Sequence, residues 1–182
     1  ETGKIIGKSK SDPVDGSYFI VLPLGKIYGY YINHSEFYPF SGNLDILKKG
    51  KSIEIVKTIE LVTFKEMIEK SIAVPMNNLF FDFGKYNLLP YSIPELNRVA
   101  QIIKKENLKV EIAGHTDNTG DEIANQTLSE KRATSVKHFL LQAGCKENLL
   151  QTIGFGESKP IDTNENEMGR AKNRRVEIRF IK

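Results

Sequence analysis

Two oppositely charged residues, Asp117 and Arg132, have the side chains and the spacing of a binding site. Asp117 comes shortly after the alternating segment 108–113, and α/β folds usually hold their ligands at the carboxyl ends of strands. Arg132 falls on the apolar face of a predicted helix, in one row with Leu128, Val136 and Leu140. A guanidinium in such a place needs a partner, because an unpaired buried charge is costly. We therefore expect a site that combines an anion, Asp117, with a cation, Arg132.

The residues around Asp117 add further polar groups to the same place. His115 and Thr116 precede it at the end of the predicted strand. Asn118-Thr119-Gly120 then predicts a turn, followed by a helix that begins without a capping side chain. Free amide groups at a helix start bind anions. The loop is therefore expected to supply hydrogen-bond donors for a carboxylate of the ligand.

Two other interpretations of these residues remain open. Asp117 and Arg132 can form a structural salt bridge, since a buried arginine is often paired. Alternatively, His115 and Asp117 can act in a hydrolase or amidase, although no motif supplies a nucleophile beside an oriented base. No metal or cofactor is expected, because the remaining candidate ligands have no suitable spacing with His115; these are His34, His138 and Cys145.

The composition is that of an ordinary globular chain of 182 residues, with 40% hydrophobic and 27% charged residues. A net charge of +3 without a long basic run argues against a nucleic-acid binder, which stays a minor alternative. The single cysteine excludes an intramolecular disulfide. No apolar run reaches the ~18 residues of a membrane span. Because Glu1-Thr-Gly-Lys4 does not resemble a natural start, we expect the chain to be a fragment.

Strand and helix patterns alternate along the chain from residue 78 onward. Leu79, Phe81 and Phe83 alternate as in a buried strand, and Ser92-Ile-Pro-Glu95 has the form of a capping box that starts a helix. The later elements are predicted as a strand at 108–113, a helix at 121–143, a strand at 149–153, a short helix at 168–172 and a strand at 175–181. The order βαβα and then two strands predicts an α/β (α+β) two-layer sandwich with a mixed sheet.

The first third of the chain has the composition of a small β-rich module, which we place at 1–62. Apolar and aromatic residues predict strands at 18–22, 27–32 and 52–62, with a hairpin connection at 23–26 and a polar loop at 41–51. The segment 63–77 is interpreted as a linker that can hold a short helix before Pro75. The second domain is then expected at 78–182.

Several motifs resemble the OmpA-like peptidoglycan-binding domain over residues 76–182. Their order and spacing carry the resemblance, since each motif alone is weak. The motifs are Phe81-Asp82-Phe83, Gly114-His-Thr-Asp117, Asn125, Leu128-Ser129, Arg132-Ala133, Gly154-Phe-Gly156-Glu157 and Asn173-Arg-Arg-Val-Glu177. Members of this family bind the bacterial cell wall without covalent bonds and tether envelope proteins to it. The resemblance therefore implies a binding protein and not an enzyme.

The resemblance also implies a ligand, the diaminopimelate of the peptide stem. Asp117 matches the residue that receives its ammonium, and Arg132 matches the one that takes its carboxylate. This assignment makes chemical sense, because charge-assisted hydrogen bonds are strong and the arginine fork fits a carboxylate bidentately. The remaining ligand-binding residues that it implies are Thr116, Asn125 and Arg174. Gly84 is placed at the rim of the pocket, where this sequence departs from the acidic or polar residue that the family often has.

Partner and location follow from the same resemblance. It implies peptidoglycan as the partner, no nucleic acid, and a place at the periplasmic face of the outer membrane of a Gram-negative-type bacterium. The attachment to that membrane would lie in a segment missing from this chain. The alternative within this setting is a peptidoglycan-active hydrolase or amidase that uses His115 and Asp117.

The β-rich module resembles part of a transthyretin-like, carboxypeptidase-regulatory-type β-sandwich. The matching residues are Asp15-Gly-Ser-Tyr18, Leu22-Pro-Leu-Gly-Lys26 and Tyr28-Gly-Tyr30. This resemblance implies a structural, β-sandwich-like module without chemistry of its own.

Overall fold

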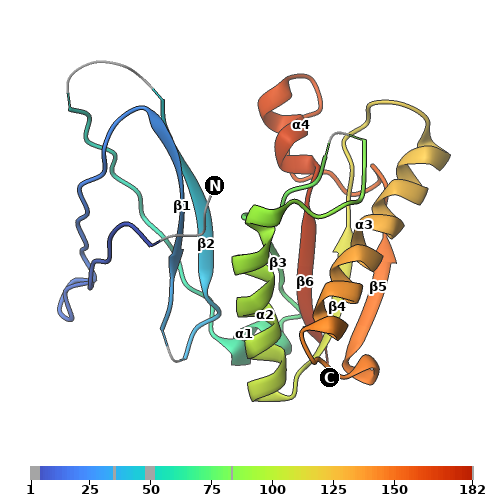
Figure 1. The fold of residues 1–182 in the computed structure, drawn as a ribbon, viewed down its shortest axis with the longest axis horizontal. Helices are drawn as coiled ribbons and strands as arrows, with labels where there is room; N and C mark the ends of the chain where they lie inside the picture. Colours follow the sequence, from blue (N-terminus) through green and yellow to red (C-terminus); the bar gives the residue numbers. More distant parts are fainter. Residues whose placement is uncertain (1–4, 35, 48–51, 83, 182) are drawn as a thin grey trace.

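The computed structural model describes residues 5–34, 36–47, 52–82 and 84–181 (Figure 1). Its main sheet has the strand order β3-β6-β4-β5. β4 and β5 are parallel, whereas β6 runs antiparallel to both β4 and β3. The predicted mixed sheet is therefore confirmed. The strands are β3 (Ala73–Pro75), β4 (Lys109–Gly114), β5 (Leu150–Gly154) and β6 (Val176–Ile181).

Two long helices, α2 (Ile93–Glu106) and α3 (Glu122–Gln142), form the second layer in front of this sheet (Figure 1). Shorter helices, α1 (Phe64–Glu69) and α4 (Glu167–Asn173), flank it, with 3-10 turns η1 (Pro90–Ser92) and η2 (Glu147–Leu149). The two-layer sandwich and the positions of the helices and strands after residue 92 agree with the sequence prediction. Among the described residues, no helix is both long and apolar enough to cross a membrane.

The core lies between the helices and the inner face of the sheet. On β6, Val176, Ile178 and Phe180 are buried while the residues between them are less so, as expected when one face of a strand is covered. α2 contributes an i, i+3, i+4, i+7 stripe to the same core. That stripe consists of Leu96, Val99, Ala100 and Ile103. Each fully buried side chain of this size stabilises the fold by about 1.5–3 kcal/mol.

The strand predicted at 79–83 is wrong for the described part of that segment. The backbone there is irregular, with a single bridge between Phe81 and Leu88, and Phe83 lies outside the described residues. The reason is the side chain of Ser92. Its Oγ accepts a hydrogen bond from the amide of Phe80 (2.8 Å) and donates to the carbonyl of Phe80 (3.1 Å). The amide of Leu89 also donates to this carbonyl (3.0 Å), so a hydroxyl and one backbone amide take the place of a neighbouring strand.

The capping box predicted at Ser92 is wrong for the same reason. The hydroxyl of Ser92 bonds Phe80, and α2 has no side-chain cap at its start. Glu95, the expected partner, instead accepts a hydrogen bond from the hydroxyl of Ser41 (2.9 Å) and pairs with Arg98. A capping box does exist one helix earlier, between Thr63 and Glu66.

The segment 63–77, predicted to be a linker, holds regular structure. It contains α1, which confirms the short helix, and also β3, which pairs with β6 at one edge of the main sheet. The first strand of the sheet therefore lies before residue 78. Three residues ending in Pro75 are too few to show a strand period, so the sequence carried no signal for β3.

The N-terminal module holds one antiparallel pair, β1 (Lys26–Ile32) and β2 (Phe40–Ile46). β1 confirms the strand predicted at 27–32. The strands predicted at 18–22 and 52–62 are wrong, and so is the hairpin at 23–26, because the partner of β1 comes after it in the chain. The described part of this module holds no second sheet to pack on the β1–β2 pair, so the likeness to a sandwich stays a prediction.

The loop predicted at 41–51 is wrong for 41–46, which form β2, while 48–51 lie outside the described residues. Polar residues form this strand because partners outside the module satisfy them. Ser41 bonds Glu95 through its hydroxyl and accepts from the Asn77 amide at its carbonyl (2.8 Å). Asn43 donates to the carbonyl of Asn77 (3.1 Å).

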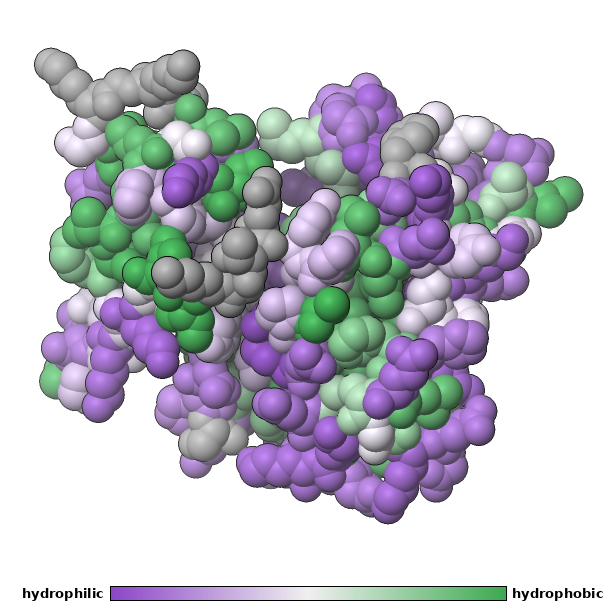
Figure 2. All heavy atoms as spheres, viewed as in Figure 1, coloured by the Kyte–Doolittle hydropathy of each residue, from purple (hydrophilic) through white to green (hydrophobic). Residues whose placement is uncertain are grey.

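Tyr38 joins the N-terminal module to the main core. Its side chain is 6% exposed, and its ring meets the edges of Phe64 and Phe180 at centroid distances of 6.1 and 5.7 Å. Elsewhere the module leaves many apolar side chains in solvent, and Figure 2 shows them as green spheres over this part of the molecule. Phe19 is 78% exposed and Val21 is 77% exposed.

Candidate ligand-binding site

The segment 115–117 connects the carboxyl end of β4 to the site. The amide of His115 donates to the carbonyl of Arg175 beside β6 (2.9 Å), and the amide of Thr116 donates to the carbonyl of Gly156 after β5 (2.8 Å). These bonds hold the segment between the ends of both neighbouring strands. Asp117 therefore leaves the sheet at a fixed position, as expected for a ligand-binding residue in this class of fold.

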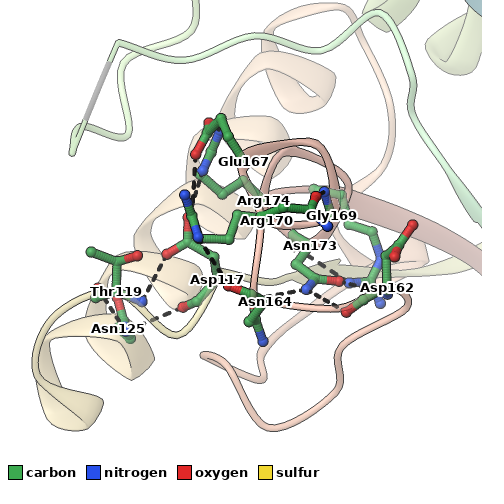
Figure 3. A network of polar contacts seen from close by, with 12 residues as sticks. Asp117, Thr119, Asn125, Asp162, Asn164, Glu167, Gly169, Arg170, Asn173 and Arg174 are labelled. Carbon is green, nitrogen blue, oxygen red and sulfur yellow. Dashed lines mark hydrogen bonds and ion pairs between the residues drawn. The ribbon is translucent and has the colours of Figure 1, made fainter.

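The carboxylate of Asp117 is held by two donors. Nη1 of Arg174 donates to Oδ2 (2.6 Å), and the amide of Thr119 donates to Oδ1 (2.9 Å), as Figure 3 shows for the arginine. Burial acts to raise the pKa of Asp117, but the hydrogen bonds from Arg174 and Thr119 outweigh it and lower the pKa below its usual value. Asp117 is thus an oriented anion at neutral pH.

Arg132 is buried in a different way. Its side chain comes from α3, is 6% exposed, and donates from Nε to the carbonyl of Lys85 (3.1 Å). The guanidinium carbon lies 5.1 Å from the centre of the Phe81 ring. Neither terminal nitrogen of Arg132 bonds an acceptor in the part of the chain that the structure describes. Within these residues, the guanidinium is held through Nε alone.

The electrostatics of Arg132 reflect this arrangement. Burial lowers the pKa of its guanidinium, and the like charge of Arg174 lowers it further, while Asp117 acts in the opposite direction. Asp117 and Arg132 therefore lie within one electrostatic site. They do not form the direct ion pair that the sequence suggested as a structural alternative, because the partner of Asp117 is Arg174.

Asn125 fastens the loop after Asp117 to α3. Its Nδ2 donates to the carbonyls of Asp117 (3.3 Å) and Thr119 (3.2 Å) and to Oε2 of Glu157 (2.6 Å). α3 is continuous from residue 122, so Asn125 and Arg132, seven residues apart, point to the same side, as predicted. In this structure Asn125 holds the loop that carries the carboxylate.

Arg174 follows α4 and bridges two carboxylates. Nη1 bonds Asp117, and Nη2 bonds Oε1 of Glu167 at the first turn of α4 (Figure 3). Burial acts to lower the pKa of Arg174, but the hydrogen bonds to Glu167 and Asp117 raise it above its usual value. Both terminal nitrogens of Arg174 are therefore occupied by protein side chains.

A fully buried side chain, Asn173, holds the loop that leads into α4. Its Oδ1 accepts from the amides of Ile161 (2.8 Å) and Asp162 (3.0 Å), and its Nδ2 donates to Oδ1 of Asn164 (2.9 Å). These bonds, drawn in part in Figure 3, bind the loop to the end of the helix. They place the next residue, Arg174, against Asp117.

The helix start after Asp117 differs from the prediction of an uncapped end. Asp121 caps α3, since its Oδ1 accepts from the amide of Ala124 (2.9 Å). The amide of Thr119, another expected donor to the ligand, is used by Asp117 itself. Two amides of this turn are therefore taken by carboxylates of the protein, and anion binding by the remaining amides stays a prediction.

Thr116 and Gly84 lie at the edges of the site. Thr116 is 4% exposed, and its hydroxyl has no hydrogen-bond partner in the described structure. Gly84 is exposed, has a φ of +64°, and directly precedes Lys85, whose carbonyl anchors Arg132. That φ favours glycine. Gly84 thus shapes the turn that supplies the acceptor for Arg132.

His115 does not contact the carboxylate of Asp117. Its ring is 1% exposed and stacks on Phe155 at a centroid distance of 5.3 Å. Its Nε2 lies 3.5 Å from Oε2 of Glu177, at the outer limit of a hydrogen bond. His115 therefore belongs to the packing beneath the site.

The sequence prediction missed three contributors to the site. These are the carbonyl of Lys85, the carboxylate that receives Asn125, and the carboxylate that receives Arg174; the last two belong to Glu157 and Glu167. Every residue has a backbone carbonyl, so the sequence does not show which carbonyl accepts from Arg132. Glu157 lies 32 residues after Asn125, and only the fold brings the two together. Glu167 begins α4, seven residues before Arg174, a spacing that does not identify it as the partner of that arginine.

The profile of the OmpA family matches residues 80–174, just over half of the 182 residues. The chain belongs to the OmpA family. The matched region includes Asp117, Asn125, Arg132 and Arg174, the side chains that the structure brings together.

Among similar proteins, Outer membrane protein A of Bordetella avium is 45% identical over 103 residues, which cover 56% of this chain and 53% of that protein. Peptidoglycan-binding protein ArfA of Mycobacterium tuberculosis is 44% identical over 93 residues, 50% of this chain and 28% of that protein. The crystal structure of the peptidoglycan-associated lipoprotein from Burkholderia pseudomallei has a TM-score of 0.53 at 28% identity and covers 56% of this chain and 87% of that one. The chain spans about half or less of these curated relatives.

Proposed function

We propose that this protein binds peptidoglycan without catalysis, through the diaminopimelate of the peptide stem. The fork of Arg132 takes the distal carboxylate of diaminopimelate, and the carboxylate of Asp117 takes the neighbouring ammonium. Thr116, Asn125 and Arg174 form the wall of the pocket, and Gly84 forms its rim. An amino acid end carries one charge of each sign a few ångströms apart, so two fixed opposite charges recognise it together.

The observation that carries this proposal is the state of Arg132. Arg132 is 6% exposed, both terminal nitrogens of its guanidinium lack an acceptor among the described residues, and the oriented carboxylate of Asp117 lies nearby. Burying a charge without a partner is costly. A carboxylate of the ligand would offset that cost. A purely structural arginine would instead have its terminal nitrogens paired within the protein.

The names of the relatives support the same ligand class. One relative is called a peptidoglycan-binding protein, and one similar crystal structure is of a peptidoglycan-associated lipoprotein. We infer that this chain has the corresponding role of anchoring an envelope protein to the cell wall, at the periplasmic face of the outer membrane. In this proposal residues 78–182 form the binding domain, with β3 completing its sheet.

The alternative, a peptidoglycan hydrolase or amidase using His115 and Asp117, is less well supported. His115 is 1% exposed and directed to Glu177, so it is not placed to exchange a proton with a substrate at Asp117. Ser129 is also unavailable as a nucleophile, because its hydroxyl donates to Gln126 and accepts from the amide of Gly156.

The test is co-sedimentation with purified sacculi. The wild-type protein is expected to pellet and to release no soluble fragments, while Asp117→Ala and Arg132→Ala are each expected to lower the affinity at least roughly tenfold, as loss of a charge-assisted contact does. The matched control is Lys146→Ala, which removes one exposed positive charge just before η2, beyond the end of α3 that is far from the site. Release of muropeptides would instead support the enzyme.

Competition identifies the ligand group. A stem peptide with diaminopimelate is expected to displace the protein from sacculi, whereas the same peptide with lysine is not, because lysine lacks the distal carboxylate. Thermal unfolding of each variant separates binding from folding. If both alanine variants still pellet like the wild type, the proposed site is wrong. If they unfold early, the charges are structural.

A further inference from the structure

The two arginines of the site differ in what they offer a ligand. Arg132 has both terminal nitrogens without a protein acceptor among the described residues, whereas Arg174 has both engaged, one by Asp117 and one by Glu167. The bond to Asp117 orients the carboxylate that receives the ammonium. The bond to Glu167 does not orient the carboxylate of Asp117, because Glu167 bonds neither Asp117 nor Arg132 in the described structure.

The side-chain carboxylate of Glu167 resembles the distal carboxylate of the proposed ligand. Glu167 presents a carboxylate to an arginine fork beside Asp117, as the distal carboxylate of a diaminopimelate would (Figure 3). Its side chain is 67% exposed and reaches in from α4, so it can leave without disturbing the core. Arg170 also donates from Nε to Oε2 of Glu167 (3.2 Å), and this bond remains available to Glu167 when Arg174 is released.

We propose that Glu167 is an affinity-setting residue, an internal carboxylate that occupies Arg174 until the carboxylate of the ligand displaces it. This inference rests on the proposed function. Arg174 then completes a two-arginine grip on the distal carboxylate together with Arg132, while Nη1 stays on Asp117. Displacing Glu167 from Arg174 costs free energy, so the site binds the ligand less tightly than it would without that side chain.

The proposal predicts the direction of a mutational effect. Glu167→Gln keeps the shape of the side chain but weakens its hold on Arg174, so the affinity for a diaminopimelate stem peptide is expected to rise. An exposed ion pair is weak, and the gain is therefore roughly two- to fivefold. A residue that merely supported the site would give the opposite sign, a loss of affinity.

The experiment is a calorimetric titration of the chain with a soluble diaminopimelate tripeptide, after wild-type binding to sacculi has been measured. The matched control is Glu165→Gln, which removes an exposed carboxylate two residues away that has no ion pair within the described ranges. Glu165→Gln is expected to bind like the wild type. With a lysine tripeptide, which has no distal carboxylate, Glu167→Gln is expected to give no gain.

A double variant tests whether the gain in affinity from Glu167→Gln acts through Arg174. In an Arg174→Gln background, adding Glu167→Gln is expected to change nothing, because the arginine that it releases is absent. Unchanged or weaker binding of Glu167→Gln, with the wild type binding normally, would overturn the inference and leave the proposed function intact. Failure of the wild type to bind both sacculi and tripeptide would overturn both.

Discussion

Arg132 and Arg174 show that one residue type performs two tasks within a single site. Arg174 is bonded through Nη1 and Nη2 to carboxylates of the protein, and its charge is balanced locally. Among the described residues Arg132 is anchored through Nε alone, so its orientation is set while its terminal nitrogens are those that we propose for the ligand. This division follows from geometry, because a guanidinium has five donors and can be held by some while others bind.

Glu177 leads to a prediction about acid stability. Burial acts to raise its pKa, but His115 and Arg175 outweigh burial and lower the pKa from 4.5 to about 2. A carboxylate with a depressed pKa stabilises the fold above its unfolded-state pKa, and this stability is lost as pH falls toward the folded-state value. The contribution of Glu177 should therefore disappear between about pH 4.5 and pH 2.

The measurement is urea unfolding of the wild type and Glu177→Gln between pH 6 and pH 2.5. The difference between their free energies of unfolding should shrink toward low pH, by on the order of 3 kcal/mol when the whole shift is counted. Glu165→Gln, an exposed carboxylate, serves as the control and should track the wild type at every pH. A constant difference for Glu177→Gln would contradict the prediction.

At the scale of elements, the site depends on how closely α3 approaches the end of β4. A Cβ added to Gly114 would lie 2.1 Å from the carbonyl oxygen of Ser129, a backbone atom in the middle of α3. Only glycine permits this approach. The contact brings the α3 residues Asn125 and Arg132 to the loop that carries Asp117.

Gly114→Ala is therefore expected to push α3 away from β4 and to lower the free energy of unfolding by at least about 2 kcal/mol, the usual cost of overpacking. Binding to sacculi should fall as well, because Arg132 and Asp117 lose their relative positions. Urea unfolding and co-sedimentation measure the two effects.

The matched control is Gly29→Ala in β1. A Cβ there would meet its nearest atom, Oδ1 of Asn78, at 3.5 Å, which is an ordinary contact. Its effect should stay within about 0.5 kcal/mol. Equal stability of the Gly114→Ala and wild-type proteins would show that α3 does not pack as described.

At the scale of the whole molecule, the N-terminal module and the main sheet share buried contacts. Tyr38 packs on Phe64 and Phe180, and the buried hydroxyl of Ser41 bonds Glu95 on α2. Arg98, which pairs with Glu95, also lies over the ring of Tyr31 at 4.4 Å. The module is therefore part of the packing that supports the binding domain.

Tyr38→Ala is expected to destabilise the entire described fold by about 3–5 kcal/mol, the range for removal of a large buried aromatic side chain. Hydrogen exchange should show lost protection in β6 as well as in β1 and β2, because the cavity borders Phe180. Phe19→Ala removes an aromatic ring that is 78% exposed and should change little. Loss of protection limited to the N-terminal module would refute the shared core.

Features with a local or periodic cause could be predicted from the sequence. The stripe on α2, the alternation on β6 and the row that contains Arg132 repeat often enough to specify helix, strand and buried face. The spaced motifs around Asp117 and Arg132 identified the family, which the comparisons confirm. The order and spacing of these residues along the chain are sufficient to recognise the pattern, so no tertiary information was needed.

Which polar groups pair with one another depends on the tertiary structure. Ser92 bonds Phe80 instead of capping α2, and Asp117 pairs with Arg174 instead of Arg132. Polar residues of β2 form a strand because Glu95 accepts from Ser41 and the carbonyl of Asn77 accepts from Asn43. A polar side chain takes whichever partner folding brings within about 3 Å, and the alternatives differ by only about 1 kcal/mol. Separation along the chain carries no information about that choice.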